Sequence, residues 1–348
     1  MTAWLLFFFC LWRCRRFGHP VIGRLEVEKL RGIALHVENF GFHTFTLLFL
    51  AIEHTAFKVL IFLCIQVDES VVPVVDNEKH KARKGYMWVV RDVLTGAIVF
   101  WYDTGARTKE AARKLLGDYR GVFQTDGYPV YDEFCEKNGV AGAACWAHVR
   151  RKFVSALNSD RTLATQAIVQ IRELYKVEKE ADELGLTAEE RKIKRTDESY
   201  PVIQTFEKWC MDTYPKVLPK SPVGEAVAYA YSLMERLALY CTDGRINIDN
   251  NLIENSIRPL ALGRKNWLFC GNDAAATRAA IVYSMISSCR AAGIDARAWM
   301  EDVLLEIPYR QENGLPLDDL LPHEYAKREG VKKWIITDPA PKYAEQDI

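Results

Sequence analysis

The chain has 348 residues, and its 46 lysine and arginine residues balance 46 aspartate and glutamate residues, so the formal net charge is zero. Neutrality excludes a histone-like or polyacidic protein, but it leaves DNA binding open because a basic face can lie beside an acidic one. The length suits roughly two or three domains. None of the nine cysteines forms a C-x-x-C pair, which argues against a zinc ribbon and favours reduced thiols in a cytoplasmic protein.

The first 58 residues differ from the rest of the chain. Ten of the 16 phenylalanines precede Val67, and the apolar run Trp4–Trp12 is shorter than the roughly 20 residues that cross a membrane. The stretch 46–65 is long enough, but it contains Glu53 and Lys58, which are costly at a bilayer centre. We therefore expect no membrane association, and we interpret residues 1–58 as an atypical or aberrant segment that the rest of the chain can fold without.

A coherent pattern of strands and helices begins at residue 59. Runs rich in β-branched and aromatic residues predict strands at 59–67, 85–91, 96–102, 121–125 and 140–146. Helix-favouring runs predict helices at 108–116, 129–137 and 147–157, the first capped by Thr108. The order βββαβαβα indicates an α/β protein with a mixed sheet flanked by helices, and it is the order of the RNase H-like fold.

Residues 158–245 carry no strand signal, and we interpret them as a helical insertion. The sequence predicts a further helix that begins near Asp249 and ends at Pro259, one at 274–292 stopped by Gly293, and one at 296–306 ended by Pro308. A turn-rich tail at 315–322 is expected to pack on the core. The predicted divisions are an N-terminal segment 1–58, the first part of the core 59–157, the insertion 158–245, the rest of the core 246–292, and a C-terminal element 293–348.

Two aspartates follow predicted strands and are candidates for one catalytic site. Asp68 and Asp126 each come at or near the end of an apolar run. If the two strands are neighbours, the carboxylates lie close together and need a cation to offset their repulsion. Carboxylate oxygens suit Mg²⁺, and a pair of such ions supports phosphoryl transfer. Asp92 and Asp103 are rival acids, but their positions fit turns better.

The third candidate acid is Glu254, at the start of the helix near Asp249. Either Asp249 or Asn250 can cap this helix, and Arg258 lies one turn beyond Glu254, where an ordinary ion pair is possible. The neighbouring Asn250 and Asn251 are unusual for such a helix, because their amides can orient carboxylates or contact DNA.

Five motifs occur in a fixed order along the chain: VDES at 67–70, QTDGY at 124–128, CWAHVRRKF at 145–153, IDNNLIENSIRP at 248–259 and GRKNWLF at 263–269. Together they resemble the catalytic domain of the insertion-sequence-66 family of bacterial DDE transposases, from about Val67 to His323. The resemblance implies an RNase H-like core whose acidic triad is Asp68, Asp126 and Glu254, with a helical insertion between the second and third acids. These three residues would bind two Mg²⁺ ions, which Mn²⁺ can replace.

The chain also departs from the family pattern. Family members usually carry an N-terminal helical DNA-binding part and a cysteine-rich zinc motif, which this chain does not match. Asn255 stands where an arginine is usual. The first departure bears on recognition of transposon ends, and the second on a phosphate contact.

Basic and amide side chains lie where DNA would need them, and contacts of this kind position the phosphate backbone without reading sequence. The predicted DNA-binding residues are His148, Arg150, Arg151, Lys152, Asn250, Asn251, Arg258, Arg264 and Lys265. The lysine-rich stretch 79–84 is interpreted as a solvated loop. Trp146 and Trp267 are expected to pack in the core rather than stack on bases.

These features predict a DDE-type DNA transposase that cleaves phosphodiesters and transfers strands of an insertion sequence. Its expected partners are transposon ends and target DNA, a second copy of itself when assembled on DNA, and accessory proteins of the same element. We expect it in the bacterial cytoplasm, on the nucleoid when bound to DNA. A structure-specific nuclease of the same fold, and an inactive remnant that only binds DNA, remain alternatives.

Overall fold

The computed structural model describes residues 64–334 except 77, 106, 118 and 128–130. The expectations for residues 1–58, and the first part of the strand expected at 59–67, lie outside these residues. The described strands are β1 (Cys64–Asp76), β2 (Lys81–Asp92), β3 (Ile98–Asp103), β4 (Val122–Gln124) and β5 (Gly142–Ala143). The helices that alternate with them are α3 (Lys109–Leu116), α4 (Asp132–Asn138) and α5 (Trp146–Ala156). Each matches a predicted element, and Thr108 caps α3 as expected.

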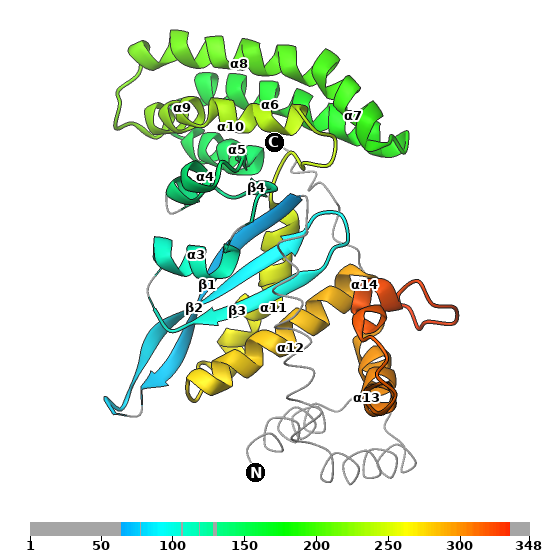
Figure 1. Cartoon of the computed structure of the whole chain (residues 1–348). Helices are drawn as coiled ribbons and strands as arrows, with labels where there is room; N and C mark the ends of the chain where they lie inside the picture. Colours follow the sequence, from blue (N-terminus) through cyan, green and yellow to red (C-terminus); the bar gives the residue numbers. More distant parts are fainter. Residues whose placement is uncertain (1–63, 77, 106, 118, 128–130, 335–348) are drawn as a thin grey trace, which may run out of the picture. The chain divides into compact units, whose positions relative to one another are not determined.

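The five strands form one mixed sheet in the order β3-β2-β1-β4-β5 (Figure 1). The strands β1, β2 and β3 pair antiparallel, whereas β4 is parallel to both β1 and β5. This arrangement confirms the predicted α/β class and the mixed sheet. Because β1 is central and β4 lies beside it, the segments that carry the first two candidate acids are adjacent.

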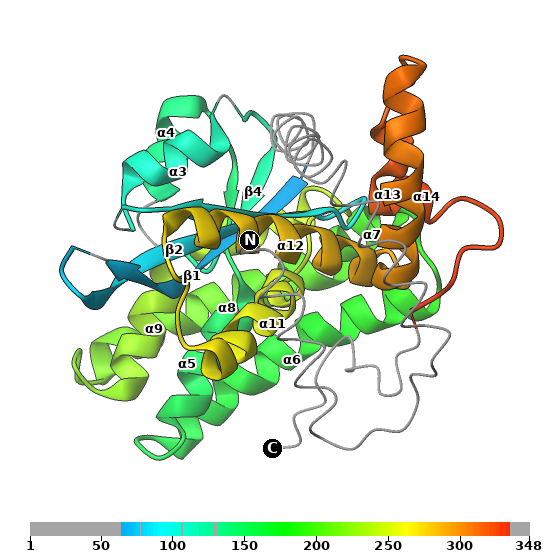
Figure 2. The ribbon, with the colours of Figure 1, turned by 90° about the horizontal axis from the view of Figure 1, so that it is seen from below.

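Helices cover both faces of the sheet. Ile65, Val67 and Trp88 pack with α3 and α4 on one face. Val72 and Val89 pack on the other face, with α11 (Asn251–Trp267) and α12 (Asp273–Ala291). Figure 2 shows α3 and α4 on one side of the strands and α11 on the other. Since side chains alternate along a strand, even-numbered residues of β1 face α11.

The first strand is longer than the sequence predicted. It continues past Asp68 to Asp76, paired along its whole described length with β2. The expected strand end at Asp68 is therefore wrong: the acid lies within the strand. The reason is the alternation after it, since Val72 and Val74 are fully buried and extend the hydrophobic face. The lysine-rich stretch 79–84 is consequently the turn and the start of β2, not a free loop.

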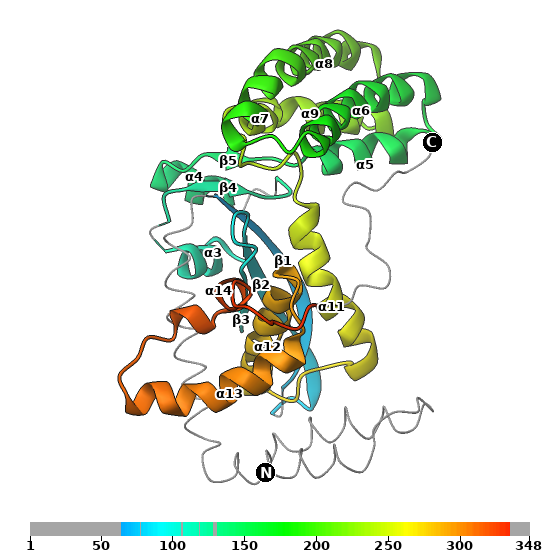
Figure 3. The same cartoon turned by 90° about the vertical axis from the view of Figure 1, so that its right-hand side faces the viewer.

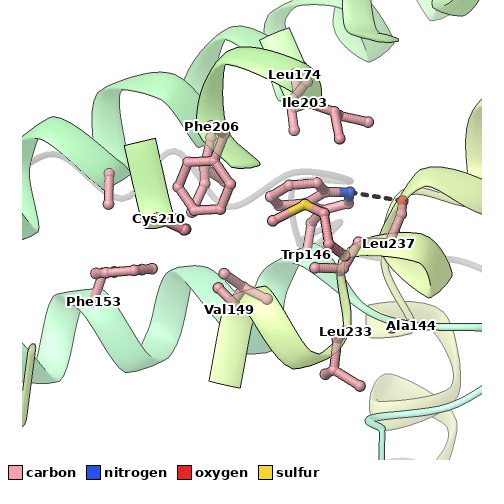
Figure 4. Packing of buried hydrophobic residues seen from close by; sticks show 14 of the residues in the cluster. Ala144, Trp146, Val149, Phe153, Leu174, Ile203, Phe206, Cys210, Leu233 and Leu237 are labelled. Atoms are coloured by element: carbon pink, nitrogen blue, oxygen red, sulfur yellow. Dashed lines mark hydrogen bonds between the residues drawn. The ribbon is translucent and has the colours of Figure 1, made fainter. Parts of the chain in front are cut away.

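All the regular elements described within residues 161–241 are helices or helical turns. They comprise α6 (Arg161–Glu183), α7 (Ala188–Lys194), a π-helical turn η3 (Arg195–Ser199), α8 (Tyr200–Thr213), η4 (Tyr214–Lys216), α9 (Pro222–Ser232), α10 (Met234–Ala238) and η5 (Leu239–Cys241). Trp146 of α5 is fully buried among them, and its Nε1 donates to the Leu237 carbonyl at 3.1 Å (Figure 4). Core packing of Trp146 is confirmed. Trp267, the last residue of α11, is partly buried and packs against the buried residues between the sheet and the helices α11 and α12.

Two helices continue past prolines that were expected to end them. Pro259 lies inside α11, and Pro308 lies inside α13 (Ala296–Glu312). Proline removes one helical hydrogen bond, but burial on both sides compensates: Ile257 and Leu260 of α11 are both buried. Beyond Pro308, Arg310 holds the last turn by donating to Glu306 and to the Pro316 carbonyl. The sequence prediction was wrong because tertiary packing outweighs this local penalty.

The tail packs on the core as expected. Its short helices are η6 (Asp318–Leu320) and α14 (Pro322–Tyr325). The indole Nε1 of Trp299 donates to the Leu320 carbonyl at 2.9 Å, and α14 contacts α12. The predicted stop of α12 is also confirmed, because Gly293 follows it with φ of 69°. None of the helices described is long and apolar enough to cross a membrane.

Candidate active site

A pair of glutamines places the first two acids side by side. Gln66 of β1 is in register with Gln124 of β4, and the Gln66 amide Nε2 donates to Gln124 Oε1 at 2.8 Å. Asp68 and Asp126 each lie two residues beyond one of these glutamines. Because β1 and β4 run parallel, equal offsets from a paired position bring the two aspartates to the same place at the edge of the shared ladder.

The same glutamines tie the strands to the chain that leads into α11. Gln66 Nε2 also donates to the Asp249 carbonyl at 2.9 Å, and Gln124 Nε2 donates to the Asn247 carbonyl at 2.7 Å. Both glutamines are fully buried. The sequence analysis did not single them out, although a signal was present: a Q-x-D triplet occurs at both acids, 66–68 and 124–126.

A tight turn follows Asp126. Gly127 has φ of +88°, a backbone conformation that glycine adopts without strain and other residues rarely adopt. The Tyr229 hydroxyl donates to the Asp126 carbonyl at 2.7 Å. The backbone at the second acid is therefore held by a hydrogen bond from α9.

The third acid is set by the start of α11, which Asp249 caps. Asp249 Oδ1 accepts the Asn251 N–H at 3.0 Å, and Oδ2 accepts the Asn251 side-chain amide at 2.9 Å. The Tyr175 hydroxyl donates to Oδ2 at 2.9 Å. Asn250 makes no side-chain cap bond, so of the two predicted caps Asp249 is the one used. Figure 3 shows α11 running from this point along β1.

Glu254 contacts α5 rather than its own helix. Arg151 donates to both Glu254 carboxylate oxygens at 3.2 Å, and His148 Nε2 lies 3.4 Å from Oε1. The ion pair between Glu254 and Arg258 that an isolated helix would allow is not formed; Arg258 is exposed. Burial and the charge of Arg151 lower the pKa of His148, so this histidine is neutral at neutral pH.

The three acids interact electrostatically. Burial raises the pKa of Asp68 to about 7, with further contributions from repulsion by Glu69, Asp126 and Glu254. The backbone N–H of Glu69 donates to Asp68 Oδ1 at 2.7 Å, which offsets only part of the effect. Glu69 itself lies on the opposite face of β1, where Tyr131 and Arg107 contact it. Asp126 and Glu254 are thus both near enough to contribute to the raised pKa of Asp68.

A buried ion pair lies beneath the loop that leads to the start of α11. Arg195 and Glu178, both 2 % exposed, form two hydrogen bonds of 2.7 Å. Arg195 also donates to the carbonyls of Tyr240, Asp243 and Ile246. The guanidinium therefore fixes the loop that runs from η5 to the α11 cap, and the helical region contributes directly to the position of Glu254.

The donor chemistry of the cluster fits a hard cation such as Mg²⁺, which prefers carboxylate oxygens. The pKa of Asp68 is raised mainly by burial and further by the neighbouring acids, and a cation would offset both effects. Nevertheless, across residues 64–334 as described, no three acidic, histidine or cysteine side chains are gathered closely enough to form a ready ligand set. Glu254 is turned toward Arg151 instead.

The predicted DNA-binding residues fall into two groups. Arg151, Lys152, Arg258 and Lys265 are exposed, while His148, Arg150 and Asn251 are half-buried. Lys152 Nζ lies 5.1 Å from the Tyr229 ring centroid. One prediction needs correction, that of Asn250. Asn250 is fully buried and has no surface for DNA. Arg264 donates to Ser70 Oγ and to the Val71 carbonyl, so it holds α11 against β1.

Comparison with known proteins agrees with this architecture. The family model described as "Transposase IS66 family" matches residues 43–278. The match begins before Val67, so it includes part of the segment that the sequence analysis set apart, and it ends before the predicted C-terminal element.

Three relatives come from Sinorhizobium fredii (strain NBRC 101917 / NGR234). Uncharacterized protein y4hP is 29 % identical over 281 residues, covering 75 % of this chain and 50 % of the relative. Uncharacterized protein y4qI is 31 % identical over 256 residues, covering 69 % and 47 %. Uncharacterized protein y4jD is 29 % identical over 269 residues, covering 73 % and 52 %. The chain thus spans about half the length of these relatives. Because the family match covers most of the chain, the protein belongs to the IS66 transposase family.

Proposed function

We propose that this protein is a DDE-type transposase that cleaves DNA phosphodiesters and transfers the cut strand, with Asp68, Asp126 and Glu254 as its catalytic acids. The observation that supports the proposal is the pairing of Gln66 with Gln124, from which Asp68 and Asp126 lie at equal offsets on neighbouring parallel strands. The Gln66 amide also donates to the Asp249 carbonyl, at the start of the helix that carries Glu254. Buried acids with raised pKa values are more frequent at functional sites than elsewhere in proteins. The strand order β3-β2-β1-β4-β5 supports an RNase H-like core, with the helices at 161–241 as the insertion.

Two Mg²⁺ ions held by the three acids would supply an activated nucleophile and stabilise the leaving oxygen. The protein's own contribution is placement. The paired glutamines hold the strands of Asp68 and Asp126 in register. The Asp249 cap and the buried Arg195 hold the start of α11, and therefore Glu254, over the same edge.

Arg151 pairs with Glu254 in the free protein and is drawn away from Glu254 when DNA binds. Without DNA, Arg151 neutralises Glu254, although its side chain is 53 % exposed. A DNA phosphate competes for the same guanidinium because charged hydrogen bonds of arginine suit phosphate and carboxylate alike. When Arg151 turns to the phosphate, Glu254 is released toward Asp68 and Asp126. Lys152, Arg258 and Lys265 provide further phosphate contacts.

The test uses duplexes that carry the terminal inverted repeats flanking the gene, with Mg²⁺ as the only divalent ion. We expect the unmodified protein to cut these duplexes and to join the cut strand to a target duplex. Asp126→Asn should abolish both steps while leaving the melting temperature close to that of the unmodified protein, because a neutral amide cannot balance the charge of the ion. Asp103→Asn is the matched control and should retain both.

Each alternative has its own outcome. Cutting without joining would identify a structure-specific nuclease. Binding without any metal-dependent cutting would identify an inactive remnant. Cleavage by Asp126→Asn at the rate of the unmodified protein would refute the assignment of the acids.

A further inference from the structure

The C-terminal end of α11 carries two exposed apolar side chains on a strained backbone. Leu268 is 62 % exposed and Phe269 is 50 % exposed. Leu268 has φ of 65° and ψ of −49°, and the Phe269 N–H donates to the Trp267 carbonyl at 2.8 Å. Leu268 is therefore the central residue of a γ-turn with positive φ, the rarer form of this turn, which strains the backbone of a leucine. Strained positions of this kind concentrate at functional surfaces.

Leu268 and Phe269 together form what we call the tip, and β1 anchors the chain on both sides of it. Before it, Arg264 donates to the Val71 carbonyl at 2.6 Å. After it, the Cys270 N–H donates to the Pro73 carbonyl, and the Cys270 carbonyl accepts the Val75 N–H, both at 2.8 Å. The tip is therefore a short, fixed projection between two attachments. Large apolar side chains held rigidly in water mark a surface that contacts another molecule.

The surroundings of the tip are basic. Lys81 and Lys84 of β2 lie across from Asp76 and Pro73 in the β1–β2 ladder, beside the residues that bond to Cys270. Lys265 lies one turn before the tip on α11. All three lysines are exposed, and the described residues offer none of them an ion-pair partner. Exposed apolar side chains on a part of the surface that also carries lysines suit a polyanion with an apolar interior, which is the chemistry of DNA.

The tip also lies at a definite distance from the acid cluster. From Glu254 to Leu268 the helix advances 14 residues, or about 21 Å at roughly 1.5 Å per residue. At about 3.4 Å per base pair this span equals roughly six base pairs. A duplex that follows α11 and β1 from the acids would therefore present its bases to the tip.

We propose that Leu268 and Phe269 form a wedge that enters DNA between base pairs, roughly six base pairs from the phosphate at the acid cluster. The inference rests on the proposed function, because it takes DNA to be the ligand of this face. It adds a base-contacting element to a surface whose other predicted contacts are with phosphates.

The experiment measures binding without divalent metal, so that it does not depend on cleavage. The full-length protein is titrated onto duplexes of the terminal inverted repeat, each with 2-aminopurine at one position. Insertion of the wedge unstacks the probe, and its fluorescence should rise most about six base pairs from the cut. Phe269→Ala should abolish the rise and weaken binding by about five- to 150-fold, the range for losing one aromatic contact with a base.

Leu268→Gly separates a DNA role from a structural one. Glycine relieves the left-handed strain, so this variant should melt at a higher temperature and yet bind DNA more weakly. Phe269→Trp should keep both the fluorescence rise and the affinity. Leu305→Ala, which changes a leucine of α13 that is 69 % exposed, is the matched control and should behave like the unmodified protein.

The proposal is overturned if Phe269→Ala leaves fluorescence and affinity unchanged. It is also overturned if that variant instead changes the sedimentation of the free protein, because the tip would then bind a second copy. A protein that shows the fluorescence rise but never cuts DNA would refute the proposed function and leave the wedge in place.

Discussion

Asp68→Asn should stabilise the metal-free protein at neutral and alkaline pH while abolishing cleavage. Burial and the neighbouring acids raise the pKa of Asp68 from 3.8 to about 7. Between these two values the folded state binds a proton that the unfolded state has released, so stability falls as pH rises through this window. Asparagine carries no charge and can still accept the Glu69 N–H with its Oδ1.

The magnitude follows from the two pKa values. Between about pH 4 and 7, each pH unit lowers the free energy of unfolding of the unmodified protein by up to about 1.4 kcal/mol relative to that of the variant. The difference in the free energy of unfolding should therefore be near zero at pH 4 and should reach about 4 kcal/mol above pH 7.

The assay is urea denaturation in the presence of a chelator, at several pH values across this window. Asp92→Asn is the contrasting control. Asp92 is also buried, but its carboxylate accepts the Thr95 N–H and hydroxyl at 2.7 and 2.6 Å. Neutralising Asp92 should lower stability by about 1 kcal/mol. A gain for Asp68→Asn that does not change with pH, or a loss of stability at pH 8, would refute the electrostatic reasoning.

Three further predictions concern the supports of the site. Gln66→Leu should lower the free energy of unfolding by about 1–3 kcal/mol for each buried acceptor left without a donor; urea denaturation that shows no loss would mean that the glutamine pair is dispensable. Glu178→Gln should cost about 3–5 kcal/mol because it leaves Arg195 buried without its counter-ion; a loss below about 1 kcal/mol, on the scale of an exposed pair, would contradict this. Lys265→Ala should weaken binding equally on all DNA sequences and lower the salt dependence by about one phosphate contact, whereas Lys208→Ala on α8 should change neither; a loss confined to certain sequences would indicate base readout instead.

Local patterns in the sequence predict most of the strands and helices and single out the candidate acids. Alternating apolar residues mark β2 and β3, Thr108 marks the start of α3, and Gly293 marks the end of α12. The candidate acids are recognisable because each lies in one of the ordered motifs that resemble the transposase family. These local patterns can be recognised without knowing the fold.

The contacts between distant segments become visible only in the folded chain. The pairing of Gln66 with Gln124, the buried Arg195 and the contact between Arg151 and Glu254 each join residues far apart in the chain. The helices run past Pro259 and Pro308 because burial on the sheet and tail outweighs the local cost of proline. Asn250 is typical of a surface amide by residue type, but it is buried, and its backbone N–H donates to Cys145 Sγ, 105 residues away in the chain. Such outcomes depend on packing energies summed over many elements, which local patterns do not contain.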